Sequence, residues 1–332
     1  MSMNSRRRVF SYSGAILVLC LAGSPVAQSG SYNFVTLDAG GGNWTELYGI
    51  NNNGVVTGIS LDPNTFLGTG VIFNGGVPTL VSVPGAVDTE FYQINSAGQI
   101  ATSYFGSDGI YHAAVYNSVN SSWTYLPDVA GYQENLAGGI NNHGVVLGDP
   151  FVNTSFQGGV GWTWNGSSYS YFSAPGADST TLGTATYGIN DAGQIVGYFQ
   201  DSSGVQHGYL KTGSNFTTLD APGANGLTSA QGINNLGYVT GYYVDASGID
   251  NGYLWYNGQF TTINVPFAGA TGTDITAIND QGDLVGWYID ANGNLHGFEA
   301  FSVPEPTTVI LMATGLMGSF LLCRRKRRSG IA

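Results

Sequence analysis

Apolar residues alternate with polar or small residues along short stretches of the chain, and glycine-rich turns separate these stretches. The runs at 194–199 (QIVGYF) and 283–288 (DLVGWY) are two examples. Alternation with a period of two predicts β-strands that bury one face. The chain also has 51 glycines and only 9% charged residues, which favours strands joined by tight turns. We therefore predict an all-β protein.

One turn sequence, Ile-Asn-x-x-Gly, recurs six times at a nearly constant spacing. Its asparagines are 44, 46, 49, 44 and 45 residues apart, at Asn51, Asn95, Asn141, Asn190, Asn234 and Asn279. Asparagine can bond to its own backbone in such turns, and glycine accepts positive φ at the last position. A fixed period of this size is the signature of a repeat architecture.

Each repeat contains four predicted strands. The first ends at Ile-Asn and the second follows the turn, while the third and fourth lie, for instance, at 207–210 and 216–220. Six such units predict a six-bladed β-propeller over residues 30–303, with an open solenoid or a pair of three-unit sheets as alternatives. The repeats start with a lone fourth strand at 32–38 and end with a third strand at 296–301. The N-terminal strand is therefore expected to complete the last blade and close the ring.

The N-terminal segment, residues 1–29, has the three-part layout of a secretory signal peptide. Arg6 to Arg8 precede an apolar run at 15–23, and small residues follow through Ala27. This layout predicts export of the protein.

The C-terminal segment, residues 304–332, begins with Pro304, Glu305 and Pro306. An apolar stretch at 308–323 and five consecutive basic residues follow. Sixteen helical residues span about 24 Å, less than the ~30 Å thickness of a hydrocarbon core. We expect a transmembrane helix that anchors the protein at least transiently, with its basic end in the cytoplasm. A plain single-span tail anchor is the alternative.

These three C-terminal parts, in this order, closely resemble the PEP-CTERM sorting signal of diderm bacteria. The resemblance covers only the last segment of the chain. It implies recognition by an exosortase-type sorting enzyme, with Pro304, Glu305 and Pro306 as the sorting motif. It also implies cleavage near this motif and delivery to the cell surface or to an extracellular exopolysaccharide matrix.

The repeats are similar to the HAF family of extracellular repeats, which takes its name from a His-Ala-Phe-like triplet in the third strand. His112, His207 and His296 begin the corresponding triplets, although no repeat has the literal sequence. Asn251 replaces the histidine in the fifth repeat, and the first and third repeats lack it. The resemblance implies an extracellular location and no assigned activity.

Charge and cysteine content exclude several classes of function. Residues 30–303 contain twenty acidic side chains and a single basic one, Lys211. Such a surface repels phosphate backbones, which excludes nucleic acid as a partner, while neutral sugars and divalent cations remain allowed.

The two cysteines, Cys20 and Cys323, both lie in the terminal segments. The body between them has no disulfide, thiolate metal site or cysteine nucleophile.

The sequence offers no catalytic residues and no metal site. Asp201, Asp245 and Asp290 each stand alone in an Asp-x-x-Gly turn, which is ordinary turn chemistry rather than a calcium loop. We expect no cofactor, apart from weak binding of Ca²⁺ by the acidic surface. The strand histidines are expected to be hydrogen-bonded rather than metal-ligating.

Five acids depart from the repeat pattern without a recognisable partner, namely Asp62, Glu90, Glu134, Asp149 and Asp274. We predict a non-enzymatic surface or matrix protein that binds or scaffolds polysaccharide. The alternative is a secreted propeller enzyme, a hydrolase or lyase acting on polysaccharide. Convergence of these acids and the aromatic residues in one axial pocket would favour the enzyme, and their scatter around the rim would favour binding or scaffolding.

Overall fold

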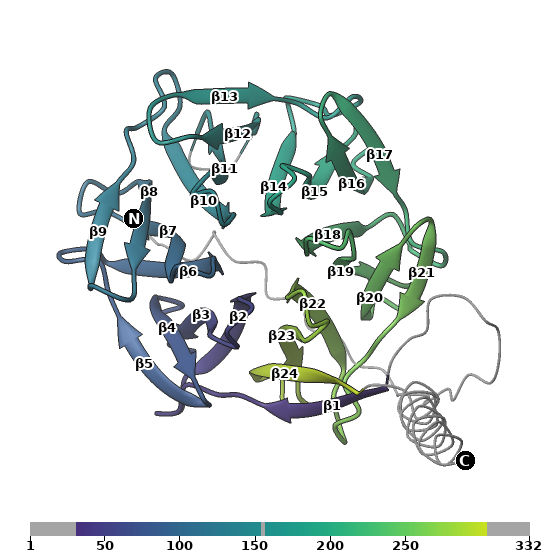
Figure 1. The fold of residues 1–332 in the computed structure, drawn as a ribbon. Coiled ribbons are helices and arrows are strands. Elements are labelled where there is room, and N and C mark those ends of the chain that lie inside the picture. The colour runs from purple at the N-terminus through teal and green to yellow at the C-terminus, as the bar shows by residue number, and fades with distance from the viewer. Residues whose placement is uncertain (1–30, 154–156, 304–332) are drawn as a thin grey trace, which may run out of the picture.

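Six four-stranded antiparallel sheets surround a central axis in the computed structural model, like blades of a propeller (Figure 1). The structure describes residues 31–153 and 157–303. The predicted signal peptide, the sorting motif and the predicted transmembrane helix lie outside these ranges. Among the described residues every element is a strand, and none is a helix that could cross a membrane. The predicted six-bladed propeller is confirmed.

Each blade runs from an innermost strand at the axis to an outermost strand at the rim. The first three blades consist of β2 (Trp44–Ile50), β3 (Val56–Leu61), β4 (Gly68–Asn74) and β5 (Val77–Val81); β6 (Asp88–Ile94), β7 (Gln99–Phe105), β8 (Tyr111–Asn117) and β9 (Ser122–Tyr125); and β10 (Glu134–Ile140), β11 (Val146–Phe151), β12 (Gly161–Trp164) and β13 (Tyr169–Phe172). Blades four and five consist of β14 (Thr184–Ile189), β15 (Ile195–Gln200), β16 (Gln206–Thr212) and β17 (Asn215–Leu219); and β18 (Thr228–Ile233), β19 (Val239–Val244), β20 (Asp250–Tyr256) and β21 (Gln259–Thr262).

The sixth blade joins the two ends of the repeat region. Its inner strands are β22 (Gly272–Ile278), β23 (Leu284–Ile289) and β24 (Leu295–Val303), and its outermost strand is β1 (Ser31–Thr36). The pairing of β1 with β24 is antiparallel, and Phe34 lies opposite Ala300. This is the closure predicted from the phase of the repeat.

The core lies between neighbouring blades, because each sheet packs both of its faces. The second residue after each turn glycine, predicted to be buried, is at most 2% exposed in all six blades: Val56, Ile100, Val146, Ile195, Val239 and Leu284. Val196 of blade four, for example, packs with Leu219 from its own outermost strand and with Ala230 of blade five. Alternate residues of a strand therefore pack against the blade before it and the blade after it.

Gly197, in the second strand of blade four, is required for a steric reason, and five of the six blades have glycine at this position. A Cβ atom added at Gly197 would lie 2.1 Å from the carbonyl oxygen of Ala185 on the innermost strand. The phenol of Tyr209 donates a hydrogen bond to the same carbonyl oxygen at 3.1 Å. Only glycine leaves space for the inner strand to approach this closely.

Candidate functional site

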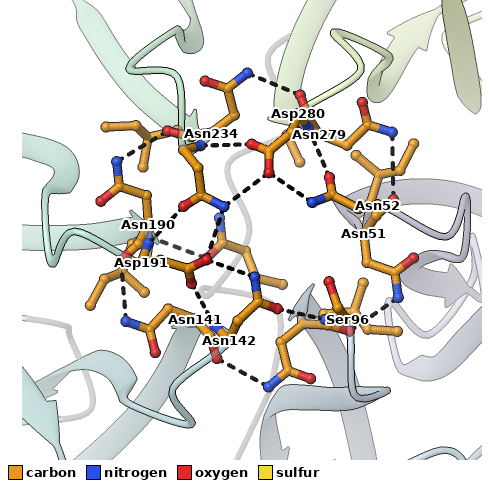
Figure 2. Close-up of a pocket in the computed structure, with 18 of the residues that line it drawn as sticks. Asn51, Asn52, Ser96, Asn141, Asn142, Asn190, Asp191, Asn234, Asn279 and Asp280 are labelled. Atoms are coloured by element: carbon orange, nitrogen blue, oxygen red, sulfur yellow. Dashed lines mark hydrogen bonds between the residues drawn. The ribbon is translucent and has the colours of Figure 1, made fainter.

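A closed ring of six asparagine side chains surrounds the propeller axis at one mouth (Figure 2). In each blade the Nδ2 atom of the turn asparagine donates to the backbone carbonyl of the equivalent asparagine in the next blade. The six donor–acceptor distances lie between 3.0 and 3.5 Å, and the ring comprises Asn51, Asn95, Asn141, Asn190, Asn234 and Asn279. All six side chains are only 3–5% exposed. These are the residues that the repeat singled out, and the structure brings all of them together.

The same side chain also holds its own turn. The Oδ1 atom of Asn141 accepts the backbone N–H groups of His143 at 3.1 Å and Val145 at 3.0 Å. Its Nδ2 atom reaches Asn190 in the next blade at 3.2 Å. Aspartate would lack the donor and serine would be too short, so this position requires asparagine.

A second ring lies at the rim of the same mouth, formed by the residue that follows each ring asparagine. Its members are Asn52, Ser96, Asn142, Asp191, Asn235 and Asp280. At five of the six blade junctions, a backbone N–H of this ring donates to a side-chain oxygen of the next blade, at 2.8–2.9 Å. Within the part of the chain that the structure describes, the junction from Asn52 to Ser96 has no such bond, because the serine side chain is short.

Asp191 and Asp280 lie on either side of Asn235 in this rim ring. The Asn235 Nδ2 atom donates to both carboxylates, at 2.9 Å each. Burial raises the pKa of Asp280, but the hydrogen bonds from Asn52 and Asn235 outweigh this and lower the pKa overall. The Asp280 carboxylate is therefore held ionised as a hydrogen-bond acceptor of the ring.

Completing the rim ring is expected to stabilise the protein. The substitution Ser96→Asn supplies the missing acceptor for the Asn52 N–H and should raise the free energy of unfolding by about 0.5–1 kcal/mol. Chemical denaturation measures this gain. Ala97→Asn, at the neighbouring exposed position, is the control and should leave stability unchanged; an equal gain there would contradict the explanation.

The two rings and six isoleucines line a small axial pocket. Its volume is about 60 Å³, well below the ~300–1,000 Å³ of most small-molecule sites, so it can hold a few water molecules. Gln93 also lines it and reaches across to blade four, where its Oε1 atom accepts the Ile189 N–H at 3.3 Å. None of the five off-pattern acids contributes to this pocket.

The off-pattern acids are instead dispersed, and four of them are buried. Glu134 accepts the N–H of Tyr111, Asp149 accepts the N–H and hydroxyl of Thr186, and Asp62 accepts N–H groups within its own turn. Glu90 and Asp274 lie on the innermost strands β6 and β22, each five residues before a ring asparagine.

Glu46 is a further buried acid, and it is not among the five that depart from the repeat in the sequence. It occupies the position of Glu90 and Asp274, so three consecutive blades have an acid five residues before the ring asparagine. The phenol of Tyr48 donates to Glu46 at 2.6 Å, and that of Tyr92 donates to Glu90 at 2.7 Å. Aligning the six innermost strands by position would have found Glu46. Burial, and then the charges of Asp250 and Glu46, raise the pKa of Asp274 well above its ordinary value.

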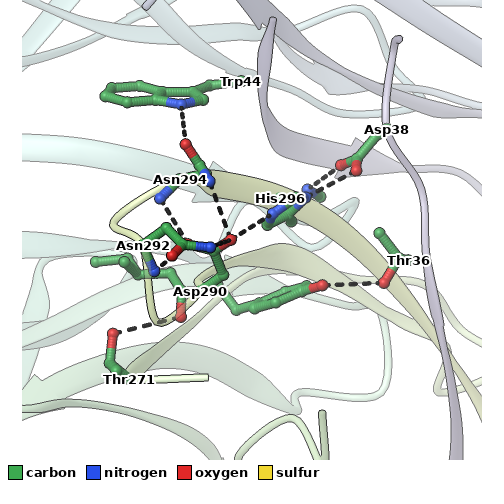
Figure 3. A network of polar contacts seen from close by, with 11 residues as sticks. Thr36, Asp38, Trp44, Thr271, Asp290, Asn292, Asn294 and His296 are labelled. Atoms are coloured by element: carbon green, nitrogen blue, oxygen red, sulfur yellow. Dashed lines mark hydrogen bonds and ion pairs between the residues drawn. The ribbon is translucent and has the colours of Figure 1, made fainter. Parts of the chain in front are cut away.

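The three strand histidines fasten outermost strands to turns. Figure 3 shows His296, whose Nδ1 bonds to Asp38 at 2.8 Å and whose Nε2 lies 3.5 Å from Asp290. Equivalent contacts join His112 to Asp128 and Asp108, and His207 to Asp220 and Asp201. In blade five, Asn251 bonds to Asp245 and Asn264 in the same way. Each histidine therefore has two carboxylate partners. No group of three or more His, Cys, Asp or Glu side chains within 31–153 and 157–303 is arranged so that it could hold a metal ion.

The Asp-x-x-Gly turns are ordinary Asx turns. Asp290 Oδ1 accepts the N–H groups of Asn292 and Asn294, at 2.8 and 2.9 Å. Asp201 accepts the Ser203 hydroxyl at 2.7 Å, and chiefly this bond lowers the pKa of Asp201 to about 2. The carboxylates of these turns accept hydrogen bonds from residues of the same turn.

Stability is expected to fall as the pH rises from 5 to 8. Desolvation lowers the pKa of the three histidines, but their carboxylate partners outweigh it and raise the pKa above 6.5. Their stabilising contribution is therefore full below about pH 6.5 and is lost as the pH rises through the raised value. Burial raises the pKa of Asp149 from 3.8 to about 7, so its contribution also falls over this range. Both groups change stability in the same direction.

The variant Asp149→Asn separates the contribution of this buried acid to the pH dependence from that of the histidines. It keeps an oxygen for the Thr186 donors but does not ionise, so we expect it to be more stable than the wild type at pH 8 by a few kcal/mol and equal to it near pH 4. Melting temperatures at a series of pH values measure this. Asp178→Asn, in an exposed turn, should leave the decline between pH 5 and 8 unchanged. An unchanged pH profile in the Asp149 variant would contradict the assignment.

Fold and terminal motif together define an exported surface protein built on a six-bladed β-propeller. Residues 302–328 match the model of the PEP-CTERM protein-sorting motif. This motif implies export, a transient membrane anchor and processing by an exosortase-type sorting enzyme on the way to the cell surface. The similarity of the repeats to the HAF family stays a prediction.

No curated protein matches the chain. Among solved structures, AofleA from Arthrobotrys oligospora is 14% identical, with a TM-score of 0.52 over 85% of this chain and 92% of that one. Aleuria aurantia lectin, a fucose-recognising lectin with a six-bladed β-propeller fold, is 13% identical, with a TM-score of 0.50 over 79% and 97%. TolB from Acinetobacter baumannii is 10% identical, with a TM-score of 0.52 over 76% and 64%. At these identities the likeness is one of fold.

Proposed function

We propose that this protein is a non-enzymatic module of the cell surface or extracellular matrix, and that its propeller binds or scaffolds polysaccharide. Residues 1–29 serve as its signal peptide and residues 304–332 as its sorting tail, and the propeller at 30–303 is the cargo that the tail delivers. The proposal rests on one observation: the recurring polar residues form structural hydrogen bonds rather than a catalytic site. The asparagine ring, the rim ring and the histidine contacts bind blade to blade or strand to strand, and so build a rigid exported platform.

The charge of the propeller favours a neutral partner. Twenty acids and one base in the body disfavour phosphate, sulfate and uronate polymers, whereas neutral sugar chains carry no charge to be repelled. Two solved propellers of this fold are named as lectins, Aleuria aurantia lectin and SapL1, the latter in complex with α-methyl fucoside.

The composition of the axial pocket supports binding over polysaccharide cleavage. A retaining or inverting glycosidase needs two carboxyl groups that flank one bond. Asp191 and Asp280 are the acids in the pocket, and asparagine donors occupy both. The pocket volume of about 60 Å³ also leaves no room for a sugar ring.

Affinity electrophoresis tests this proposal. The protein recovered from the surface of its host is run through native gels that contain the neutral polysaccharide fraction of the same host's matrix. We expect its migration to be retarded in proportion to polysaccharide concentration, while serum albumin migrates unchanged. Unretarded migration at every concentration would overturn the proposed function.

A further inference from the structure

The two ends of the propeller chain lie side by side on the sixth blade. Val303 ends β24, and Ser31, the first residue of β1, is paired directly with it (Figure 1). The predicted signal peptide precedes Ser31, and the match to the sorting motif begins at Ser302. Both terminal segments are therefore attached to the propeller at the same place.

This place lies on the face of the propeller that holds the asparagine ring. The Ser302 N–H donates to Asp283 Oδ1 at 3.1 Å, and the Ser302 hydroxyl donates to the carbonyl of Gln281 at 3.3 Å. Gln281 belongs to the turn of Asn279, the ring asparagine of blade six. We call the face with the six Ile-Asn-x-x-Gly turns the asparagine face. The opposite face, with the Asp-x-x-Gly turns and the loops between blades, is the aspartate face.

The connection from the propeller to the sorting tail is short. Residues 304–307 are all that separate Val303 from the apolar stretch at 308–323. Fully extended, the five Cα–Cα steps from Val303 to residue 308 reach only about 18 Å. A six-residue strand such as β15 already spans about 20 Å between the two faces. While the tail is anchored in the membrane, the asparagine side of blade six must therefore lie close to the membrane surface.

The acids in the described loops are divided unequally between the two faces. Three lie on the asparagine face, Asp191, Asp280 and Asp283, together with Lys211, whose ammonium donates to the Gly213 carbonyl at 2.7 Å. Nine lie on the aspartate face: Asp38, Asp62, Asp108, Asp128, Asp178, Asp201, Asp220, Asp245 and Asp290. A membrane that contains anionic lipids repels carboxylates within about one Debye length, ~8–10 Å. The asparagine face is therefore the face that such a membrane repels less.

We propose that the asparagine face is the membrane-facing surface of the anchored protein, and that its partner is an anionic lipid surface. The short connection at Val303 holds this face against the lipid headgroups, and the charge difference keeps the propeller from turning over. The aspartate face, with its histidine–aspartate contacts, then points away from the membrane and stays open to the surroundings (Figure 3). This inference rests on the sorting signal and on the chain geometry, and it does not depend on polysaccharide binding.

Quenching of attached fluorophores by lipids tests this orientation. The full chain with Cys20→Ser and Cys323→Ser is anchored in preformed vesicles of phosphatidylglycerol and a lipid that carries a nitroxide on its headgroup. One fluorophore is attached to one introduced cysteine at a time, at opposite ends of the second strand in blades four and two. The pairs are Ala192→Cys with Ser202→Cys and Ala97→Cys with Ser107→Cys, all at exposed positions.

We expect stronger quenching at the asparagine face in both pairs. The two ends of each strand lie about 20 Å apart and a nitroxide quenches only near contact, so quenching at positions 192 and 97 should exceed that at 202 and 107 at least about threefold. Both blades lie away from blade six, so a propeller that stands on its rim would show no difference between the ends.

A longer connection is the matched control. Inserting about thirty Gly and Ser residues between Val303 and Pro304 gives the connection a mean reach of about 30 Å. The acidic propeller should then leave the membrane surface, and quenching at positions 192 and 97 should fall to the level at 202 and 107.

Flotation with the vesicles shows that the chain is anchored, and melting temperatures within a few degrees of the unlabelled protein show that it is folded. Equal quenching at the two ends of each strand overturns the proposal, as does stronger quenching at positions 202 and 107. A difference that persists with the long connection, or a chain that does not float with the vesicles, also overturns it.

Discussion

Asn141→Ala is expected to lower the free energy of unfolding by about 3 kcal/mol. The change removes both acceptor bonds of the turn and the donor bond to blade four, at 3.0–3.2 Å. It leaves the half-buried N–H of Val145 without this acceptor and removes one of the donors to the Asn190 carbonyl, and lost hydrogen bonds of partly buried groups are costly. Urea denaturation followed by tryptophan fluorescence measures the loss.

Two further substitutions test whether the loss of stability comes from the hydrogen bonds of Asn141. His143→Ala, at the exposed turn position, should change stability by less than about 0.5 kcal/mol. Asn141→Asp keeps the acceptor oxygen but sets a second oxygen against the Asn190 carbonyl, so it should be destabilised at neutral pH. It should recover in part near pH 4, where a protonated carboxyl donates again. An Asn141→Ala variant as stable as His143→Ala would show that the ring does not hold the blades together.

Phe34→Ala is expected to loosen the closure of the propeller and to cost about 2–3 kcal/mol. Phe34 lies on β1, and its ring packs 5.8 Å from that of Phe298 and 6.4 Å from that of Phe267. Because β1 is held to the rest of the sheet only through β24, weaker packing there should let the strand detach locally. Hydrogen exchange of the β1 backbone amides should become faster at temperatures where the other blades remain protected.

Phe260→Ala is the matched control for this closure. Phe260 occupies the equivalent position on β21, where its ring packs 5.0 Å from that of Tyr253. The control should lose a similar amount of stability, yet leave exchange in β1 and β24 unchanged. Equal protection of β1 in the Phe34 variant and the wild type would contradict a closure that depends on this side chain.

Much of the fold was predictable because the repeat encodes it redundantly. The spacing of the six asparagines set the number of blades, and the phase of the strands at 32–38 and 296–301 predicted closure. The sequence did not show that each asparagine also donates a hydrogen bond to the next blade. The turn chemistry is local, whereas the bond to the next blade depends on how closely six turns approach at one axis, as Figure 2 shows.

The roles of the aromatic residues were harder to predict, for a physical reason. Adjacent aromatic residues in the second strand, such as Tyr198 and Phe199, draw attention in the sequence. The structure packs Phe199 in the blade core and stacks it on His207, 5.0 Å away. Tyr125 and Tyr171 are about half exposed on the outermost strands β9 and β13, and only the pairing register shows that they occupy the position of Thr218 in blade four. An exposed ring is recognised as a departure only after the repeat is aligned in three dimensions.

The most direct test of the account is size-exclusion chromatography with light scattering of the exported protein mixed with neutral matrix polysaccharide. We predict that the protein co-elutes with the polymer and that the molar mass of the polymer stays constant over hours. Polymer that shortens during the incubation would contradict the non-enzymatic account, and protein that elutes apart from an intact polymer would contradict binding.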